Sequence, residues 1–381
     1  MNILFVVTDF DMGGITVSLK NLSKELVNRG HNVSILNLPD SCEPLPFDKA
    51  INIIPLVRKS KSWNIGINDY KNSSGITKIK LLFFGIFKKI LAKFGLWEKF
   101  IFSKQPIIDC DVAVAYRQSP ICYYICKYKT NAKKTVAFIH SEFTGDCSSW
   151  IEKLKYIDKI ACVSDDWSNK FKEKFPYLSE KVETVYNIFD DNELKIKADE
   201  FYPSEFNRYK FNIVTSSRIE FSPKRLDLVP VICKKLIDKG VKDFKWYIVG
   251  DGSDREKLEK IIDENSMKDY IELVGSKKNP YPYIKNADLF ALISEWESYG
   301  MVIQESLILG TPVVSSNYPA VYEIIEDGVN SIVVEKYVDN IADGIERLYK
   351  NKDLYNRLKD NCRNYKYNKD IVYNQFLNIC K

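Results

Sequence analysis

The chain has 381 residues, of which 45% are hydrophobic and 28% are charged. This length exceeds the ~100–200 residues of a typical domain, so we expect two domains with a shared cleft, and the composition excludes a disordered chain. The formal net charge of +5 is concentrated in residues 51–105, which contain eleven basic residues and two acidic ones. This distribution excludes a globally basic nucleic-acid binder and favours one anionic contact surface.

Short apolar runs alternate with stretches of helical period in the first half of the chain, and this pattern predicts βαβ units around a parallel sheet. An amphipathic helix is predicted at 15–29 and ends at Gly30. We place this first doubly wound domain at residues 1–195. Its strands are predicted at 3–8, 31–38, 112–116, 135–140 and 159–163.

Periodicity is lost between residues 190 and 210, around Pro203, which indicates a domain boundary. A second α/β domain is predicted at 205–360, and a helical tail at 361–381 is expected to cross back to the first domain. The second domain has a predicted helix at 226–240 and predicted strands at 211–217, 246–249, 271–274, 287–293 and 311–315. Two such domains predict a ligand cleft at the carboxyl ends of their strands.

Nine scattered cysteines without a C-x-x-C pair, and only two histidines, signal neither a zinc site nor a disulfide framework. The apolar N-terminus lacks the basic residues of a signal peptide and soon reaches Asp9 and Asp11. No run approaches the ~18 apolar residues of a membrane span. We therefore expect a cytoplasmic protein with no signal peptide and no transmembrane helix.

Gly13 and Gly14 lie between the first predicted strand and the first predicted helix. Paired glycines let a ligand approach the backbone, and a helix N-terminus suits a phosphate group. A Gly-Gly turn is otherwise only a tight connection, and the lack of a G-x-G-x-x-G motif disfavours a nicotinamide dinucleotide. Asp9 and Asp11 also fit an Asp-x-Asp metal clamp, but the adjacent glycines favour a phosphate cradle without metal.

Arg218 and Lys224 follow the first predicted strand of the second domain and are six residues apart in a loop that contains Pro223. Both cations can converge on one diphosphate, the arginine through its planar fork and the lysine as a compact charge. The alternative is a solvated basic loop.

The strongest motif spans residues 294–314. Glu297 lies in a strand-exit loop, Gly300 precedes an apolar helix predicted at 301–309, and Glu305 lies inside that helix. An acid within an apolar helix needs a polar partner. The alternative is a surface helix that carries two acids.

The spacing from Glu297 to Glu305, with a Tyr-Gly between them and a Gly-Thr-Pro-Val-Val strand after them, resembles the E-x7-E region of retaining, family-4-type glycosyltransferases (glycosyl transferases group 1). The resemblance implies the GT-B fold, in which two Rossmann-like doubly wound domains face each other across a cleft. The stretches that agree with it elsewhere are Gly13-Gly14, 186–190, Arg218 to Lys224, 249–252, 275–281 and 319–325.

The same resemblance implies a role for each matching residue. Glu305 would bind the ribose hydroxyls, and Glu297 would face the donor sugar. Further contacts would come from Arg218 and Lys224 at the diphosphate, Gly13 and Gly14 at its distal phosphate, His140 at the sugar hydroxyls, Gly275 and Ser276 on the base side, and the helix start at Tyr299, Gly300 and Met301. Glu297, His140, Arg218 and Lys224 are thus the expected catalytic residues.

The chain departs from the family pattern beside Glu297. Ser298 and Tyr299 stand where the family usually has Gly and Phe, which we expect to alter the sugar pocket. Glu295 is an additional acid, and it is a second candidate for the sugar-side carboxylate.

The implied activity is retaining transfer of a hexosyl or N-acetylhexosaminyl group from a nucleotide-diphosphate sugar, with UDP favoured, to a saccharide or lipid-linked acceptor. Such enzymes build bacterial cell-surface polysaccharides and glycolipids, and we expect neither a metal nor another cofactor. Attack from the face that the leaving phosphate occupies is favoured, because the sequence places no carboxylate on the opposite face. The alternatives are a nucleotide-sugar epimerase and a non-catalytic, glycosyltransferase-like membrane subunit.

Residues 77–104 predict a basic amphipathic helix on the first, acceptor-side domain. Its apolar residues recur every three or four positions and are Ile79, Phe83, Ile86, Phe87, Ile90, Phe94, Trp97 and Ile101. This profile is typical of interfacial membrane binding and predicts contact with an anionic membrane surface, on the inner face of the cell membrane. The alternative is a helix packed on the domain, and Gly85 and Gly95 weaken a continuous helix.

Overall fold

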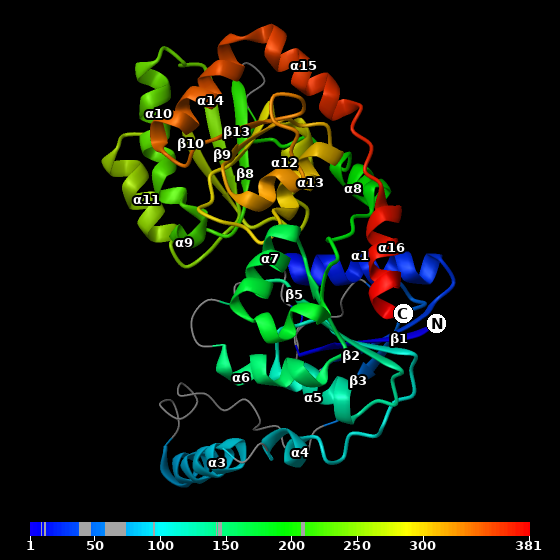
Figure 1. Cartoon of the computed structure of the whole chain (residues 1–381). Helices are drawn as coiled ribbons and strands as arrows, with labels where there is room; N and C mark the ends of the chain where they lie inside the picture. The colour runs from blue at the N-terminus through cyan, green and yellow to red at the C-terminus, as the bar shows by residue number, and fades with distance from the viewer. Residues whose placement is uncertain are drawn as a thin grey trace. The chain divides into compact units, whose positions relative to one another are not determined.

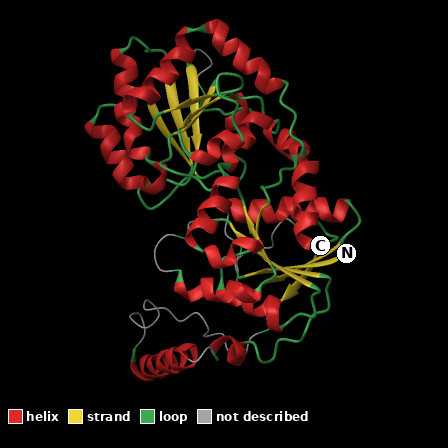
Figure 2. Ribbon diagram, in the orientation of Figure 1, coloured by secondary structure: helices red, strands yellow, loops and turns green. Residues whose placement is uncertain are grey.

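The computed structural model describes residues 1–381 except 9, 11–12, 38–46, 58–73, 94–95, 142, 144–146 and 207–209. The chain forms two compact units (Figure 1). The first comprises Met1–Cys162, Phe171–Glu183 and Gln375–Lys381, and the second comprises Val163–Lys170 and Thr184–Asn374. Each unit holds a parallel sheet between helices (Figure 2), which confirms the predicted α/β class with two Rossmann-like domains.

The sheet of the first unit has the strand order β3-β2-β1-β4-β5-β6-β7. Strand β1 pairs in parallel with both neighbours, so that Ile3 lies beside Val33 of β2 and Val112 of β4. Residues Ile3–Val7 are at most 1% exposed, because a parallel sheet is covered by helices on both faces. The strands are β1 (Asn2–Val7), β2 (Asn32–Asn37), β3 (Asn52–Pro55), β4 (Val112–Ala115), β5 (Lys134–Ile139), β6 (Lys159–Cys162) and β7 (Val182–Thr184).

Helices α1 and α16 lie on one face of this sheet, and α5 lies on the other (Figure 1). Helix α16 reaches the core through Phe376, whose ring centroid lies 6.1 Å from that of Phe5. The helices are α1 (Gly14–Asn28), α3 (Gly75–Lys93), α4 (Trp97–Ile101), α5 (Pro120–Tyr128), α6 (Ser148–Ile151), α7 (Asp165–Lys174) and α16 (Lys369–Cys380). The first turns of α7 and the first half of α16, up to Asn374, belong to the second unit.

The sheet of the second unit has the strand order β10-β9-β8-β11-β12-β13. Helices α10, α11 and α14 cover one face and α12 and α13 the other (Figure 1). Its strands are β8 (Phe211–Ser216), β9 (Phe244–Val249), β10 (Ile271–Gly275), β11 (Leu289–Leu292), β12 (Val313–Ser316) and β13 (Ile332–Val334). Its helices are α8 (Asp191–Ala198), α9 (Phe221–Lys224), α10 (Val229–Asp238), α11 (Arg255–Glu264), α12 (Tyr281–Asn286), α13 (Met301–Ile308), α14 (Val338–Lys350) and α15 (Lys352–Arg363).

Several element boundaries differ from the sequence prediction. The stretch at 226–240 is a short 3₁₀ turn followed by α10, which carries Pro230 in its first turn, where a residue without an N–H is tolerated. Helix α8 begins inside the range 1–195 that was predicted as the first domain, and it packs against α12 and α13 of the second unit. The tail contains the end of α15 and then a separate helix, α16. Within the described residues, no helix has the length and apolarity required to cross a membrane.

Candidate nucleotide-sugar site

Loops at the carboxyl ends of β8 and β9 lie in direct contact in the second unit. A Cβ atom at Gly250 or Gly252 would overlap the backbone of Ser217 or Ile219, so only glycine allows this approach. The amide of Ile219 donates to the carbonyl of Asp251 at 3.0 Å. These contacts fix the backbone on both sides of Arg218.

Lys224 and Glu297 meet at the end of the same sheet. The Lys224 Nζ lies 2.6 Å from Glu297 Oε1, and the Ser294 hydroxyl donates to the same oxygen at 2.7 Å. The two charged side chains are only 16% and 14% exposed. The Glu295 amide donates to the Pro223 carbonyl at 2.8 Å, which joins the loop after β8 to the loop after β11. Two residues that the sequence places 73 positions apart therefore form one partly buried ion pair.

Arg218 does not join this pair. Its side chain is 72% exposed, and its Nη1 lies 3.1 Å from Glu220 Oε1. The expected convergence of Arg218 and Lys224 is therefore not formed in this structure, in which each cation pairs with a different carboxylate.

Glu295, the additional acid, lies in a separate surface network. Its carboxylate is 51% exposed and contacts Arg225 at 3.1 Å and Lys336 at 3.3 Å. Sequence reasoning missed both partners, because nothing in the local pattern connects residues 225 and 336. Of the two candidate carboxylates, Glu297 is the one that pairs with Lys224.

Gly300 allows α13 to begin directly after this loop. Its φ of +97° lies in the left-handed region, and a Cβ atom there would overlap the hydroxyl of Tyr318. The loop therefore turns sharply into the helix at Met301. The amides of the first helical turn lie beside the loop that carries Glu297, at the positive end of the helix dipole.

Glu305 lies on α13 and is 7% exposed. Burial raises the pKa of its carboxyl from the ordinary 4.5 to about 8, while a hydrogen bond with the Tyr281 hydroxyl opposes part of this shift. Tyr281 is the polar partner that an acid in an apolar helix requires. Sequence reasoning identified this requirement but not the residue that meets it.

Gly275 ends β10 with a φ of +81°, and its carbonyl accepts a hydrogen bond from the Gly250 amide at 2.9 Å. Ser276 follows and is exposed. The base-side loop predicted from the sequence is thus fixed to the loop after β9, and its serine side chain remains at the surface.

His140 follows β5 in the first unit and is 6% exposed. Its ring hydrogen-bonds to the backbone of Tyr116, while Nε2 has no hydrogen-bond partner among the described residues. Burial first, and the nearby charge of Arg117 second, lower the pKa of His140 from 6.5 to about 3. The Gln118 side-chain oxygen accepts from the His140 amide at 3.1 Å and fixes the loop. His140 is therefore a neutral imidazole whose Nε2 is left to accept a hydrogen bond.

Gly13 and Gly14 form the start of α1. Gly13 caps the helix in an extended conformation, and its carbonyl accepts from the Thr16 amide at 3.1 Å. Gly14 is exposed. The alternative metal clamp at Asp9 and Asp11 lies outside the described residues.

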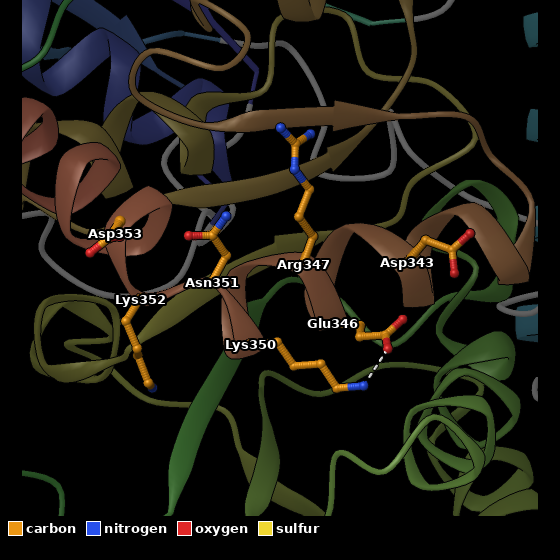
Figure 3. A pocket seen from close by; sticks show the side chains of 7 residues that line it. All are labelled: Asp343, Glu346, Arg347, Lys350, Asn351, Lys352 and Asp353. Atoms are coloured by element: carbon orange, nitrogen blue, oxygen red, sulfur yellow. Dashed lines mark hydrogen bonds and ion pairs between the residues drawn. The ribbon is translucent and has the colours of Figure 1, made fainter.

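An open hollow of about 600 Å³ lies elsewhere on the second unit, on α14 and the start of α15 (Figure 3). Its lining contains the 2.7 Å ion pair of Lys350 and Glu346. None of the predicted site residues lines it. Within the described ranges, no group of His, Cys, Asp or Glu is placed to hold a metal ion.

Two models of known protein families match the chain and decide its enzyme class. Residues 197–365 match the model of Glycosyl transferases group 1, and residues 12–193 match that of Glycosyltransferase Family 4. The chain is a group 1, family-4-like glycosyltransferase. This finding confirms the enzyme class and the GT-B assignment made from the E-x7-E region.

Relatives of this glycosyltransferase include the alpha-monoglucosyldiacylglycerol synthase of Acholeplasma laidlawii, 25% identical over 85% of this chain and 82% of the relative. The N-acetyl-alpha-D-glucosaminyl L-malate synthase of Bacillus anthracis is 25% identical over 67% of this chain and 68% of its own length.

Solved structures share the fold. TarM of S. aureus, crystallised with Fondaparinux, alpha-GlcNAc-glycerol and UDP, has a TM-score of 0.71 at 16% identity and covers 100% of this chain and 99% of its own. HepE of Anabaena, crystallised with UDP and glucose, has a TM-score of 0.69 at 15% identity, with 99% and 98% covered.

Proposed function

We propose that this glycosyltransferase moves a hexosyl or N-acetylhexosaminyl group from a UDP-sugar to a lipid-linked or saccharide acceptor, with retention at the anomeric carbon and without a metal ion. The observation that carries the proposal is the pairing of Lys224 with Glu297 beside the start of α13, with Glu305 buried further along that helix. We assign Lys224 and the amides at the start of α13 to the diphosphate, Glu297 to the sugar and Glu305 to the ribose.

The leaving diphosphate is the group whose charge grows in the transition state. Lys224 and the first-turn amides of α13 stabilise that charge, and they are preorganised by the contacts of the loops after β8 and β11. Arg218 is exposed on the same loop as Lys224 and moves from Glu220 to the diphosphate when the donor binds. Glu305 accepts hydrogen bonds from the ribose hydroxyls and retains its bond with Tyr281.

Sugar recognition is assigned to Glu297 and His140. Glu297 pairs with Lys224, and we assign its carboxylate to the place where positive charge develops on the sugar. The neutral His140 accepts a hydrogen bond from a sugar hydroxyl at Nε2. Gly13 and Gly14 have no side chain at the start of α1 and leave room for the distal phosphate. The acceptor hydroxyl attacks from the face that the phosphate leaves, and the departing phosphate oxygen takes its proton.

One relative supports a lipid-linked acceptor. The Acholeplasma relative is an alpha-monoglucosyldiacylglycerol synthase, and it is similar to this chain over 85% of the chain's length. A lipid-linked acceptor places the reaction at a membrane surface, where the first unit has a suitable helix.

Helix α3 exposes apolar side chains beside lysines. It packs on α4 through Phe84 and Phe87, whose rings lie 5.7 Å from Trp97 and 5.3 Å from Phe100. Five other apolar residues of α3 are 48–68% exposed: Ile79, Leu82, Phe83, Ile86 and Ile90. In Figure 1 α3 lies beside α4 and away from the sheet of the first unit. We assign this surface to contact with an anionic membrane, to which each nearby lysine contributes ~1 kcal/mol. The proposed location is peripheral, on the inner face of the cell membrane.

A panel of nucleotide sugars tests the enzymatic part of the proposal. We expect slow release of UDP from one UDP-sugar in the absence of acceptor, at a rate that EDTA leaves unchanged. Isomerised but intact donor would instead identify an epimerase, and no turnover of any donor would identify a non-catalytic subunit. An inverted product anomer would contradict retention.

Liposome co-sedimentation tests the membrane contact. We expect the full chain to bind vesicles with anionic lipid more strongly than neutral vesicles, and to lose that preference at high salt because exposed charges are screened. Equal binding to both vesicles, or none, would contradict the assignment of α3.

A further inference from the structure

The loop that carries Glu297 is held by the segment at the start of α7, which the sequence analysis did not connect with the site. The Ser164 hydroxyl donates to the Ser298 carbonyl at 2.7 Å. The ring of Trp167 stacks on Trp296, with centroids 6.0 Å apart and planes inclined by 15°. The two neighbours of Glu297 in the chain are therefore each fixed by a different residue of one short segment.

The next loop residue is held from another direction. The ring of Tyr299 lies 5.6 Å from that of Tyr186, whose hydroxyl donates to Asp165 at 3.0 Å. Ser298 and Tyr299 are the positions at which the chain departs from the family pattern. Both are used here for contacts with the α7 segment and with Tyr186.

The α7 segment is itself rigidly placed. Both oxygens of the Glu323 carboxylate accept backbone amides of the first turn, from Asp165 at 2.8 Å and from Asp166 at 2.9 Å. The Trp167 amide donates to the Ser164 hydroxyl at 3.1 Å. A carboxylate at a helix N-terminus satisfies amides that have no partner within the helix. The segment can therefore act as a fixed support for the loop.

We propose that Trp167 and Ser164 are positioning residues that hold Trp296 and Ser298 and thereby set the place of the Glu297 carboxylate against the donor sugar. The inference rests on the proposed function of Glu297. Neither residue touches the carboxylate, whose own contacts are with Lys224 and Ser294. Their effect is on the backbone that carries it.

Loss of the Trp167 ring is expected to lower the rate of turnover but not the affinity for UDP. We assign the ribose and base contacts to Glu305 on α13 and to the loop at Gly275, whereas Trp167 stacks on Trp296. Loss of the Trp167 ring should leave UDP affinity intact while the sugar-side carboxylate moves. A displacement of about 1 Å at a reacting group costs up to about 100-fold in rate.

The test uses the full chain with UDP and with the UDP-sugar that gives the fastest UDP release. For Trp167→Ala we expect kcat for UDP release to fall about tenfold or more, with the Kd for UDP changed by less than about threefold. Trp167→Phe, which keeps an aromatic ring on Trp296, should recover most of the rate. Trp150→Ala removes a tryptophan ring from α6 of the first unit and serves as the matched control.

Each outcome decides the inference. Equal kcat in wild type and Trp167→Ala overturns it, and so does a parallel loss of rate and UDP affinity, which would indicate general unfolding. Failure of Trp167→Phe to recover the rate also overturns it. A wild type that turns over no nucleotide sugar overturns the proposed function and this inference together, whereas an active wild type with an equally active variant overturns this inference alone.

Discussion

Helix α13 of the second unit and helix α3 of the first break the usual distribution of residues in opposite ways. On α13 a carboxyl, that of Glu305, is buried among apolar residues, whereas on α3 an apolar ring, that of Phe83, is 68% exposed. A buried polar group and an exposed apolar patch are the two informative exceptions in a folded protein. The first has its partner in Tyr281. The second has its proposed partner outside the chain, in the membrane.

The largest expected effect concerns the ion pair beside the start of α13. Lys224→Ala removes the cation that pairs with Glu297 and that we assign to the leaving diphosphate. The kcat for UDP release should fall about 100- to 1000-fold, as on loss of one preorganised charge-stabilising group. Steady-state kinetics measures this. Lys336→Ala removes a cation from the surface network of Glu295, and its kcat should stay within about twofold of the wild-type value. An equal loss of kcat in both variants would contradict the separate roles of Glu297 and Glu295.

A charge placed on α3 tests whether its exposed apolar surface binds the membrane. Phe83→Asp should lower the partition onto anionic vesicles about tenfold or more, because one large apolar side chain no longer enters the interface. Tyr337→Asp alters a side chain that is 72% exposed in the second unit, and it should bind vesicles as the wild type does. Unchanged partition of Phe83→Asp would show that α3 does not face the membrane.

The buried state of Glu305 predicts a pH-dependent stability. Its pKa of about 8 in the folded chain lies above the ordinary 4.5, so folding favours the protonated carboxyl. Between these values the unfolded chain loses the proton while the folded chain keeps it, and the free energy of unfolding therefore falls as pH rises from 4.5 to 8.

Urea denaturation at several pH values measures this decline. Glu305→Gln, which stays neutral, should reduce it, whereas Glu295→Gln, at a half-exposed carboxylate, should not. An equally steep decline in wild type and Glu305→Gln would place the titrating group elsewhere.

The smallest expected effect concerns His140. Because burial lowers its pKa to about 3, His140 stays neutral from pH 5 to pH 9 and contributes no inflection to the pH profile of kcat/KM in that range. The profile of His140→Gln should have the same shape as that of the wild type at a lower rate. Loss of an inflection near pH 6 to 7 in the variant would show that His140 titrates during turnover.

Local patterns in the sequence predicted much of the fold. The long buried strands β1, β5 and β8 and the helices α1 and α13 were predicted because apolar runs and capping glycines are local signals. The missed strands β3, β7 and β13 have three or four residues each and are only partly buried, so none carries the longer apolar run that revealed the fully buried β4.

The site was predicted less completely. Glu297 and Glu305 were found from their spacing, but the partners Lys224 and Tyr281 come from other elements. Contacts across such distances in the chain depend on how the loops of the second unit pack, which no local pattern records. The support of Trp296 by Trp167 was missed for the same reason.

Titration calorimetry with UDP tests the central claim most directly, namely that the carboxyl ends of β8 and β11 and the start of α13 form a nucleotide-sugar site. We expect the wild type to bind UDP, and Glu305→Ala to lose about tenfold or more in affinity because the ribose hydroxyls lose their hydrogen-bond partner. A wild type that does not bind UDP, or a Glu305→Ala variant that binds it equally well, would contradict this account.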